Sequence, residues 1–294
     1  MVTAPQLYFH IKNIFENNRI ENPQFEAMCV VEHIFRKKLG TLLLEKPFAA
    51  EEQIKFADNI AYRRISGEPL QYLLGEWEFF GLPFYVGRGV LIPRQDTETL
   101  VETVIESSRN FIKPKIIDLC SGSGCIACSV SAYVKNAEVY ALEKSERAIG
   151  YLNKNIELNK SKITLIQADV LKPEAALVYG NFDIIACNPP YLTANDMNFL
   201  QKEVTYEPAE ALFGGLDGLD FYRKITELWR NFLNDGGILA YEIGMGQEND
   251  VSDIMKKNGF TNILFIKDLS GVIRVVKGCL LYTSPSPRDT ERSR

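Results

Sequence analysis

The tetrapeptide Asn188-Pro189-Pro190-Tyr191 is the segment of this sequence whose residue types most clearly define a chemistry. Two successive prolines fix φ and remove two N–H donors, and the residue before a proline favours extended geometry. The segment is therefore a stiff arm that exposes acceptors. The side-chain oxygen of Asn188 and the carbonyl of Pro189 can each accept a hydrogen bond from one NH2 group. Tyr191 can lie against the planar group that carries this NH2.

Two acceptors on one NH2 group favour attack by its nitrogen. An amide nitrogen is a poor nucleophile because its lone pair is delocalised into the carbonyl. Acceptors on its hydrogens return charge to the nitrogen and orient the lone pair, so positioning and electrostatics supply most of the catalysis. No general base is needed before a methyl group is transferred to such a nitrogen. The plain alternative is that Asn-Pro-Pro forms an ordinary turn.

A glycine turn, Cys120-Ser121-Gly122-Ser123-Gly124, follows one apolar run and precedes a helix-like segment. Its glycines let the backbone approach a ligand closely, and the start of a helix offers free N–H groups. Glu143 follows about 20 residues later, at the end of the next apolar run, where a carboxylate can accept ribose hydroxyls. The turn by itself fits a nicotinamide dinucleotide, S-adenosylmethionine, or no ligand at all.

The arm decides between the two cofactors, because an enzyme that transfers hydride has no evident use for a clamp on an NH2 group. S-adenosylmethionine is therefore expected. Asp169 and Val170 follow the next run along the chain. In a parallel sheet that loop reaches the same edge, where Asp169 can meet an adenine amino group and Val170 can pack against the ring. A helix cap is an equally good interpretation of Asp169.

Short strands must position these residues. Seven apolar, β-branched runs alternate mostly with helix-length segments, and they occupy residues 115–119, 138–142, 163–167, 182–187, 237–243, 262–266 and 272–276. This pattern predicts a doubly wound α/β sheet, mostly parallel. The last two runs are joined by too few residues for a helical crossover, so one of those two strands is expected to run antiparallel.

Four segments divide the chain. Residues 1–75 have apolar positions at helical spacing and predict a small helical domain, with start signals at Thr3 and Asn22 before Pro5 and Pro23. Residues 76–93 are aromatic and glycine-rich, which predicts a hairpin linker, and residues 94–278 form the main domain. Residues 279–294 resemble one reading frame of a sequencing-library adapter, so we expect a non-native tail; an ordinary Ser/Pro-rich tail is the alternative.

Composition limits the partners and the compartment. The net charge is −5, and the first 74 residues hold nine basic and nine acidic side chains, so no nucleic-acid surface is indicated. No apolar run approaches the roughly 20 residues that span a bilayer, and no export signal is visible, so we expect a cytoplasmic protein. A monomer is also expected. The six cysteines are then free thiols. An iron–sulfur spacing at Cys120, Cys125 and Cys128, with Cys187 far downstream, is the weaker interpretation, and no metal is expected.

With other stretches, these residues resemble the HemK/PrmC family of release factor glutamine methyltransferases. The matching stretches are Arg64 to Gly75, Leu91 to Glu102, Tyr206 to Pro208, Ala211 to Leu219, and Tyr241 to Gly244 with Gln247. The resemblance implies a class I, Rossmann-like methyltransferase fold with a helical domain that helps to dock the release factor. It implies methyl transfer from S-adenosylmethionine to the side-chain N5 of the glutamine in the Gly-Gly-Gln motif of peptide release factors.

The resemblance also assigns residues. Cofactor contacts are implied for the turn at Cys120 to Gly124, for Glu143, for Val170 and for Asn188, while Asn188 to Tyr191 would hold the glutamine. One departure is that Cys120 and Ser121 stand where many members have Gly-Thr, and we expect Cys120 to fit the turn with a negative φ.

Two other substrates use the same chemistry. A sister group methylates a glutamine of a large-subunit ribosomal protein, and the stretch Pro93 to Glu98 favours the release-factor branch only moderately. Adenine or cytosine amino groups of nucleic acid present the same two hydrogens, but they would require a flipped base and a basic groove, and neither is indicated.

Overall fold

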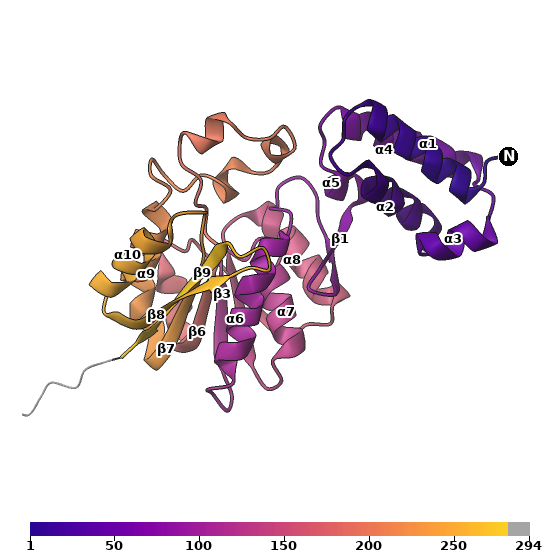
Figure 1. Ribbon diagram of the computed structural model, residues 1–294. Coiled ribbons are helices and arrows are strands. Elements are labelled where there is room, and N and C mark those ends of the chain that lie inside the picture. Colours follow the sequence, from indigo (N-terminus) through magenta and orange to yellow (C-terminus); the bar gives the residue numbers. More distant parts are fainter. Residues whose placement is uncertain (282–294) are drawn as a thin grey trace, which may run out of the picture. The chain divides into compact units, whose positions relative to one another are not determined.

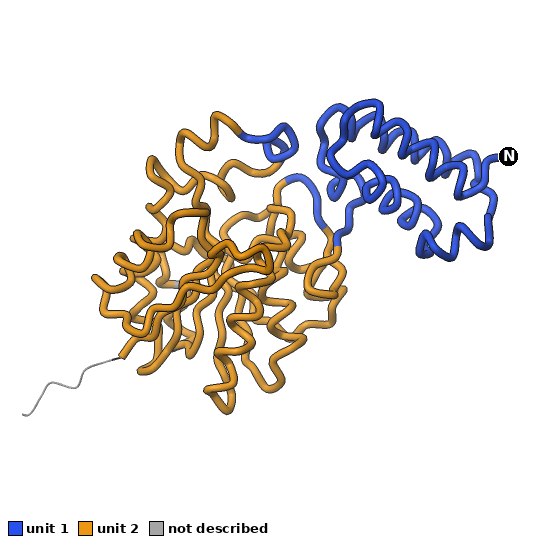
Figure 2. The backbone as a smooth tube through the Cα atoms, in the orientation of Figure 1, with its two compact units in different colours: residues 1–77, 86–88, 200–206 blue, residues 78–85, 89–199, 207–294 orange. Residues whose placement is uncertain are grey.

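A computed structural model describes residues 1–281 of the chain, and the predicted tail beyond residue 281 lies outside the described residues. The chain forms two compact units (Figure 2). The first comprises residues 1–77, 86–88 and 200–206, and the second comprises residues 78–85, 89–199 and 207–281 of the described chain. No helix of the described residues is both long and apolar enough to cross a membrane.

The first unit is built from helices α1 (Ala4–Asn17), α2 (Pro23–Phe35), α3 (Leu39–Glu45), α4 (Glu51–Ile65) and α5 (Leu70–Leu74) (Figure 1). Helix α1 begins where the sequence predicts, because Thr3 and Gln6 form a capping box that satisfies free N–H groups. One apolar stripe from each of the longer helices enters a common core, which includes Leu7, Ile11, Phe15, Val30, Val31, Leu42, Ala57 and Ile60.

A segment from the distant part of the sequence completes this first unit. Residues 200–206, which end in the short helix η4 (Val204–Tyr206), pack with the helices. Arg64 is only 4% exposed and pairs with Glu26 and with Glu203, each at 2.6 Å. A buried guanidinium is tolerated only where carboxylates pair with it, so Glu203 fixes this segment to α4.

The second unit contains a seven-stranded sheet in the order β5-β4-β3-β6-β7-β9-β8. The strands are β3 (Lys115–Leu119), β4 (Glu138–Glu143), β5 (Ile163–Gln167), β6 (Phe182–Cys187), β7 (Leu233–Glu242), β8 (Phe260–Lys267) and β9 (Ile273–Leu280). Five strands are parallel, and β9 runs antiparallel to both β7 and β8. The predicted mostly parallel sheet with an antiparallel strand is therefore confirmed.

Strand ends depart from the sequence prediction most at two places, by four residues each. Strand β7 begins at Leu233 rather than at Gly237, because its first residues pair with β6 before the apolar run starts. Strand β9 continues through Cys279 and Leu280, where Leu280 pairs with Gly237 and is 2% exposed. The sheet thus includes two residues that the sequence interpretation placed in the tail.

The longer helices of the second unit are α6 (Glu98–Ser108), α7 (Cys125–Tyr133), α8 (Glu146–Leu158), α9 (Asp220–Trp229) and α10 (Glu248–Lys257). Short helices η1 (Gln95–Thr97), η2 (Pro173–Tyr179), η3 (Asp196–Asn198), η5 (Ala209–Ala211) and η6 (Arg230–Phe232) join them, and a hairpin of β1 (Glu76–Phe79) and β2 (Leu82–Tyr85) precedes the sheet.

Large aromatic side chains of α9 fill the core against the sheet, and their polar atoms are satisfied. The indole N–H of Trp229 donates to the carbonyl of Val170 at 2.8 Å, and the hydroxyl of Tyr222 donates to the carbonyl of Glu242 at 2.9 Å. Buried aromatic groups keep such partners because an unpaired donor costs free energy. Both bonds hold α9 against strand-end loops, and these loops carry the site.

Candidate active site

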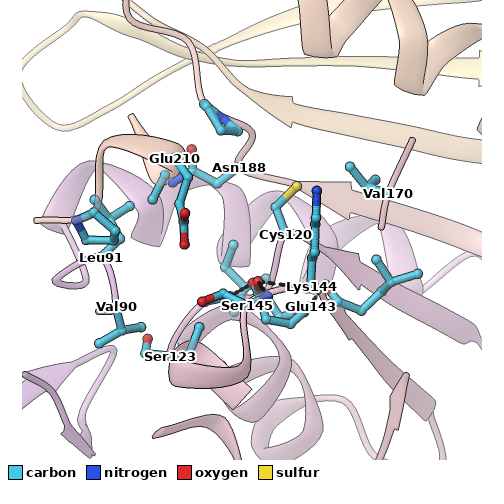
Figure 3. Close-up of a pocket in the computed structure, with 18 of the residues that line it drawn as sticks. Val90, Leu91, Cys120, Ser123, Glu143, Lys144, Ser145, Val170, Asn188 and Glu210 are labelled. Atoms are coloured by element: carbon cyan, nitrogen blue, oxygen red, sulfur yellow. Dashed lines mark hydrogen bonds between the residues drawn. The ribbon is translucent and has the colours of Figure 1, made fainter. Parts of the chain in front are cut away.

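A cavity of about 390 Å³ opens at the carboxyl ends of β3, β4 and β6 (Figure 3). It lies wholly within the second unit. Most of the sequence-predicted cofactor residues line it, namely Cys120, Ser121, Gly122, Ser123, Glu143, Asp169, Val170 and Asn188. Of the predicted substrate residues, Asn188 and Pro190 line it, whereas Pro189 and Tyr191 do not, and the predicted cofactor residue Gly124 does not line it either. The carboxyl edge of a doubly wound sheet is the usual place for such a pocket.

The glycine turn is held in left-handed geometry. Gly122 has φ +54° and Gly124 has φ +80°. A Cβ at Gly124 would lie 2.2 Å from Cδ1 of Leu152, which is a buried residue of α8, so only glycine fits there. The expectation of a negative φ at Cys120 is wrong, because its φ is +59°. The next residue explains this geometry. The N–H of Ser121 donates to the carbonyl of Leu142 at 3.1 Å, and this bond requires the chain to turn sharply at the end of β3.

Glu143 is fixed by backbone N–H groups. Its Oε2 accepts from Gly122 at 2.8 Å, and its Oε1 accepts from Lys144 and Ser145, both at 2.8 Å. The carboxylate therefore joins the glycine turn to the start of α8, and Figure 3 shows it at the floor of the cavity. A carboxylate offers about four acceptor positions, so one remains for a ligand hydroxyl.

Asp169 and Val170 form another wall of the cavity. One oxygen of Asp169 accepts from the N–H of Leu171 at 2.9 Å, and the other pairs with Lys144 at 2.9 Å. These contacts hold the pKa of Asp169 below its ordinary value, although its partial burial opposes them. Val170 is 5% exposed and presents an apolar surface beside Leu142 and Leu171, which suits a planar ring.

Asn188 lies at the rim where β6 ends. Its Nδ2 donates to Oγ1 of Thr97 at 3.3 Å, so the amide nitrogen faces η1. An amide group with its nitrogen engaged leaves its oxygen for another donor, which is what a clamp on an NH2 group requires.

Residues far along the sequence brace the arm. Leu192 donates to the carbonyl of Leu212 at 2.9 Å and accepts from Gly214 at 2.8 Å. The glycine at 214 is needed because a Cβ there would lie 2.6 Å from the carbonyl oxygen of Pro190. Gly218 is in the same situation, since a Cβ there would lie 2.3 Å from the carbonyl oxygen of Tyr191. The glycine-rich loop at residues 214–218 can approach the arm only because it lacks side chains at these points.

Gln247 is a second brace. Its amide nitrogen donates to the carbonyl of Tyr191 at 3.1 Å, and its amide oxygen accepts from Gly244 at 2.9 Å. The ring of Tyr191 lies within 3.1 Å of the Cβ position of Gly244 and packs at the edge of the core. Burial raises the pKa of Tyr191, so its phenol stays neutral at ordinary pH.

Several cavity residues were not assigned a role from the sequence. They are Leu91, Arg94 and Thr97 from the stretch before α6, together with Lys144 and Glu210. Figure 3 shows Glu210 pointing into the cavity. Asn155 was not assigned a role either; it does not line the cavity but supports the turn, since it accepts from the N–H of Tyr85 at 2.7 Å and donates to the carbonyl of Ser123 at 2.9 Å. The stretch at residues 91–102 was a signal for the first three, but nothing in the local pattern indicated Asn155.

The thiols of the second unit are buried or half-buried. Burial raises the pKa of Cys128 to about 12, and it also raises the pKa of Cys187 well above its ordinary value. Within residues 1–281, no cluster of three or more histidine, cysteine or acidic side chains is arranged to hold a metal ion.

Comparisons with known proteins first define the class. A sequence model of the methyltransferase small domain matches residues 95–213, and a model of the PrmC N-terminal domain matches residues 6–75. Two solved structures share the fold at 18% identity. One is a methyltransferase from Pyrococcus furiosus, with a TM-score of 0.50 over 76% of this chain and 100% of that chain. The other is a 16S rRNA methyltransferase from Thermus thermophilus, in complex with AdoMet and guanosine, with a TM-score of 0.51 over 70% of this chain and 49% of that chain. The chain is a methyltransferase with a Rossmann-like sheet.

Curated relatives define the family. A release factor glutamine methyltransferase of Thermodesulfovibrio yellowstonii is 38% identical, over 85% of this chain and 90% of the relative. Another, from Flavobacterium psychrophilum, is 41% identical over 91% of this chain and 94% of the relative. The chain therefore belongs to the family of release factor glutamine methyltransferases, as the resemblance in its motifs predicted.

Proposed function

We propose that this protein transfers a methyl group from S-adenosylmethionine to the side-chain amide nitrogen of the glutamine in the Gly-Gly-Gln motif of peptide release factors. The observation that carries the proposal is that Asn188, the first residue of the arm, lines the cavity at the carboxyl edge of the sheet while its amide nitrogen donates to Thr97, which leaves its amide oxygen as an acceptor. Family membership supplies the identity of the substrate, since the relatives are named for release factors.

The residues present fit S-adenosylmethionine. Glu143 has an acceptor position at the cavity floor for ribose hydroxyls, and Val170 with Leu142 forms an apolar wall for adenine. Asp169 lies beside that wall, with both its oxygens already in contact with Leu171 and Lys144. When bound, this cofactor supplies the electrophilic methyl group.

The chain's own residues then orient and activate the amide. The oxygen of Asn188 and the carbonyl of Pro189 accept hydrogen bonds from the two N–H groups of the glutamine side chain, which raises the electron density on its nitrogen. The proline pair and the braces from Gly214 and Gln247 keep these acceptors fixed, so little reorganisation accompanies the reaction. The nitrogen forms a bond to the methyl carbon and then loses one proton to solvent, so no side chain has to remove that proton beforehand.

The test is methyl transfer by purified protein with S-adenosylmethionine and its release factor, read by peptide mass spectrometry. We expect one methyl group on the Gly-Gly-Gln glutamine. Asn188→Ala should lower kcat about 100- to 1000-fold, because it removes one of the acceptors that stabilise the transition state. Asn231→Ala is the matched control, since Asn231 is an exposed asparagine on η6 outside the cavity.

Parallel reactions with the large-subunit ribosomal protein and with DNA separate the alternatives. Methyl groups found only on one of these substrates would overturn the release-factor assignment. Docking of the release factor by the helical domain, residues 1–75, is part of the same proposal. If altering exposed residues of α1 to α4 leaves the KM for the release factor unchanged, the helical domain does not dock the release factor.

A further inference from the structure

The orientation of the Asn188 amide group is decisive for the proposed reaction, because its two ends do opposite things. The oxygen accepts a hydrogen bond, whereas the nitrogen donates one. Only the oxygen can meet an NH2 group of the substrate productively. The proline pair fixes the backbone of the arm, but it does not choose between the two orientations of the side chain, which differ by a half-turn of the amide.

A buried carboxylate lies behind Asn188. Glu242 ends β7, is 2% exposed, and has an oxygen, Oε2, without a hydrogen-bond partner among residues 1–281. Hydrogen bonding by Thr97 and by Asn188 favours its charged form. A buried, incompletely satisfied carboxylate destabilises a fold, so its presence beside the arm calls for a functional explanation.

Thr97 and Asn188 both hydrogen-bond toward Glu242, and Thr97 also contacts Asn188. Its oxygen accepts from Nδ2 of Asn188 at 3.3 Å, and its single O–H is then available to Glu242. An ionised carboxylate accepts and never donates. The hydroxyl hydrogen of Thr97 must therefore point to Glu242, its lone pair must face Asn188, and Asn188 must turn its nitrogen inward.

We propose that Thr97 and Glu242 are positioning residues that hold the oxygen of Asn188 toward the substrate amide; the inference rests on the proposed function of the arm. Loss of the Thr97 hydroxyl leaves the amide free to turn. Protonation of Glu242 reverses the order of donors, because the carboxylic acid then donates to Thr97, and Thr97 donates to the oxygen of Asn188. In that state the amide nitrogen faces the substrate and repels its N–H groups.

Charged groups near Glu242 are few. Asp96 of η1 raises its pKa and Arg274 of β9 lowers it, while burial is the largest effect and brings it to about 7. Tyr191, Tyr222 and Cys187 face the same carboxylate, and their pKa values are raised above the ordinary ones. The buried thiol of Cys125 faces Glu242 as well, and its pKa is also raised. None of these four changes charge near pH 7. Burial also raises the pKa of Asp118, on β3, to about 8, so a transition belongs to Glu242 only if it disappears in Glu242→Gln.

The first test compares Thr97→Val, Thr97→Ser and Thr103→Val. Thr103 is a matched control, because it is a buried threonine on α6 whose hydroxyl donates to the carbonyl of Thr99 at 2.8 Å. We expect Thr97→Val to lower kcat about 10- to 100-fold with KM for the release factor and Kd for S-adenosylmethionine within about threefold. Thr97→Ser should restore most of kcat, and Thr103→Val should leave it unchanged. Equal losses in the two valine variants would overturn the proposal.

The second test is the pH profile. In the wild type kcat should rise with pH through the ionisation of Glu242 near 7, and in Glu242→Gln this rise should disappear. The kcat of that variant should fall only about 3- to 10-fold, because a neutral amide can pair with Thr97 in either orientation. In 15N-labelled protein without substrate, the side-chain NH2 signals of Asn188 should shift over the same pH range in the wild type and not in the variant.

The outcomes separate the two proposals. A wild-type chain that methylates no release factor overturns the proposed function and this inference with it. An active wild type whose pH profile survives in Glu242→Gln overturns the positioning role alone and leaves the function standing.

Discussion

Gly218 offers the sharpest test of how the arm is held. It has φ +75°, and a Cβ there would lie 2.3 Å from the carbonyl oxygen of Tyr191, which is a backbone atom that no side-chain rotation can move. Real Cβ atoms essentially never approach closer than 3.0 Å, so Gly218→Ala must shift the loop and the arm apart by at least 0.7 Å, the difference between 3.0 and 2.3 Å.

The energetic cost has two parts. An alanine in the left-handed region costs about 1–2 kcal/mol, and forced overlap in a packed region adds about 1–3 kcal/mol. Gly236 separates the two, because it also has φ +75° but has nothing within 4 Å of its Cβ position. Gly236→Ala should therefore lower the free energy of unfolding by about 1–2 kcal/mol, and Gly218→Ala by about 2–5 kcal/mol. Urea unfolding of both variants measures the difference.

Activity should separate the variants further. A displacement near 1 Å of a positioning group costs about 100-fold in rate, so Gly218→Ala should lower kcat/KM about 10- to 100-fold. Gly236→Ala should retain the wild-type value. If Gly218→Ala remains within threefold of Gly236→Ala in kcat/KM, the loop does not brace the arm, and the account of the arm given above is refuted.

Two further predictions concern buried polar groups near the turn. Asn155→Leu should destabilise the protein by about 2–4 kcal/mol in urea unfolding, because it strands the backbone groups of Tyr85 and the carbonyl of Ser123, which Asn155 now pairs; a change below about 0.5 kcal/mol would contradict this. Asp118 is buried, and burial raises its pKa from 3.8 to about 8, so the folded chain keeps its proton where the unfolded chain loses it. Stability of the wild type relative to Asp118→Asn should therefore be greatest near pH 4 and fall as the pH rises toward 8, and a flat or rising difference would contradict the burial effect.

The local pattern of apolar residues was enough to predict the sheet. The apolar runs at β3, β5 and β6 have the predicted bounds, because buried parallel strands need continuous apolar residues and the glycine, proline and polar residues around them end each run. The start of β7 was missed for the same physical reason. Asn234 to Gly237 carries no apolar signal, yet β7 already begins at Leu233, which pairs with Phe182. A strand whose pairing is set by its neighbour is not visible in its own composition.

The glycine turn shows a second limit. Cys120 carries a side chain, so the local rule predicts a negative φ, but the tertiary bond from Ser121 to Leu142 is met at φ +59°. The local preference is worth only about 1–2 kcal/mol, and a turn at a ligand site can override it. Positions of this kind are where a rule based on one residue fails.

The site divides in the same way. The sequence predicts a chemistry for the arm from Asn188 and two prolines, because those residue types alone fix the backbone and supply acceptors, and this chemistry stays a prediction. The restraints on the arm were not readable, since Thr97 lies 91 positions before Asn188 and Gln247 lies 56 positions after Tyr191. A motif thus specifies which atoms can act, while side chains brought in by the fold decide which way those atoms face. For an amide group whose two ends have opposite chemistry, that second decision separates an active clamp from an inert turn of the same sequence.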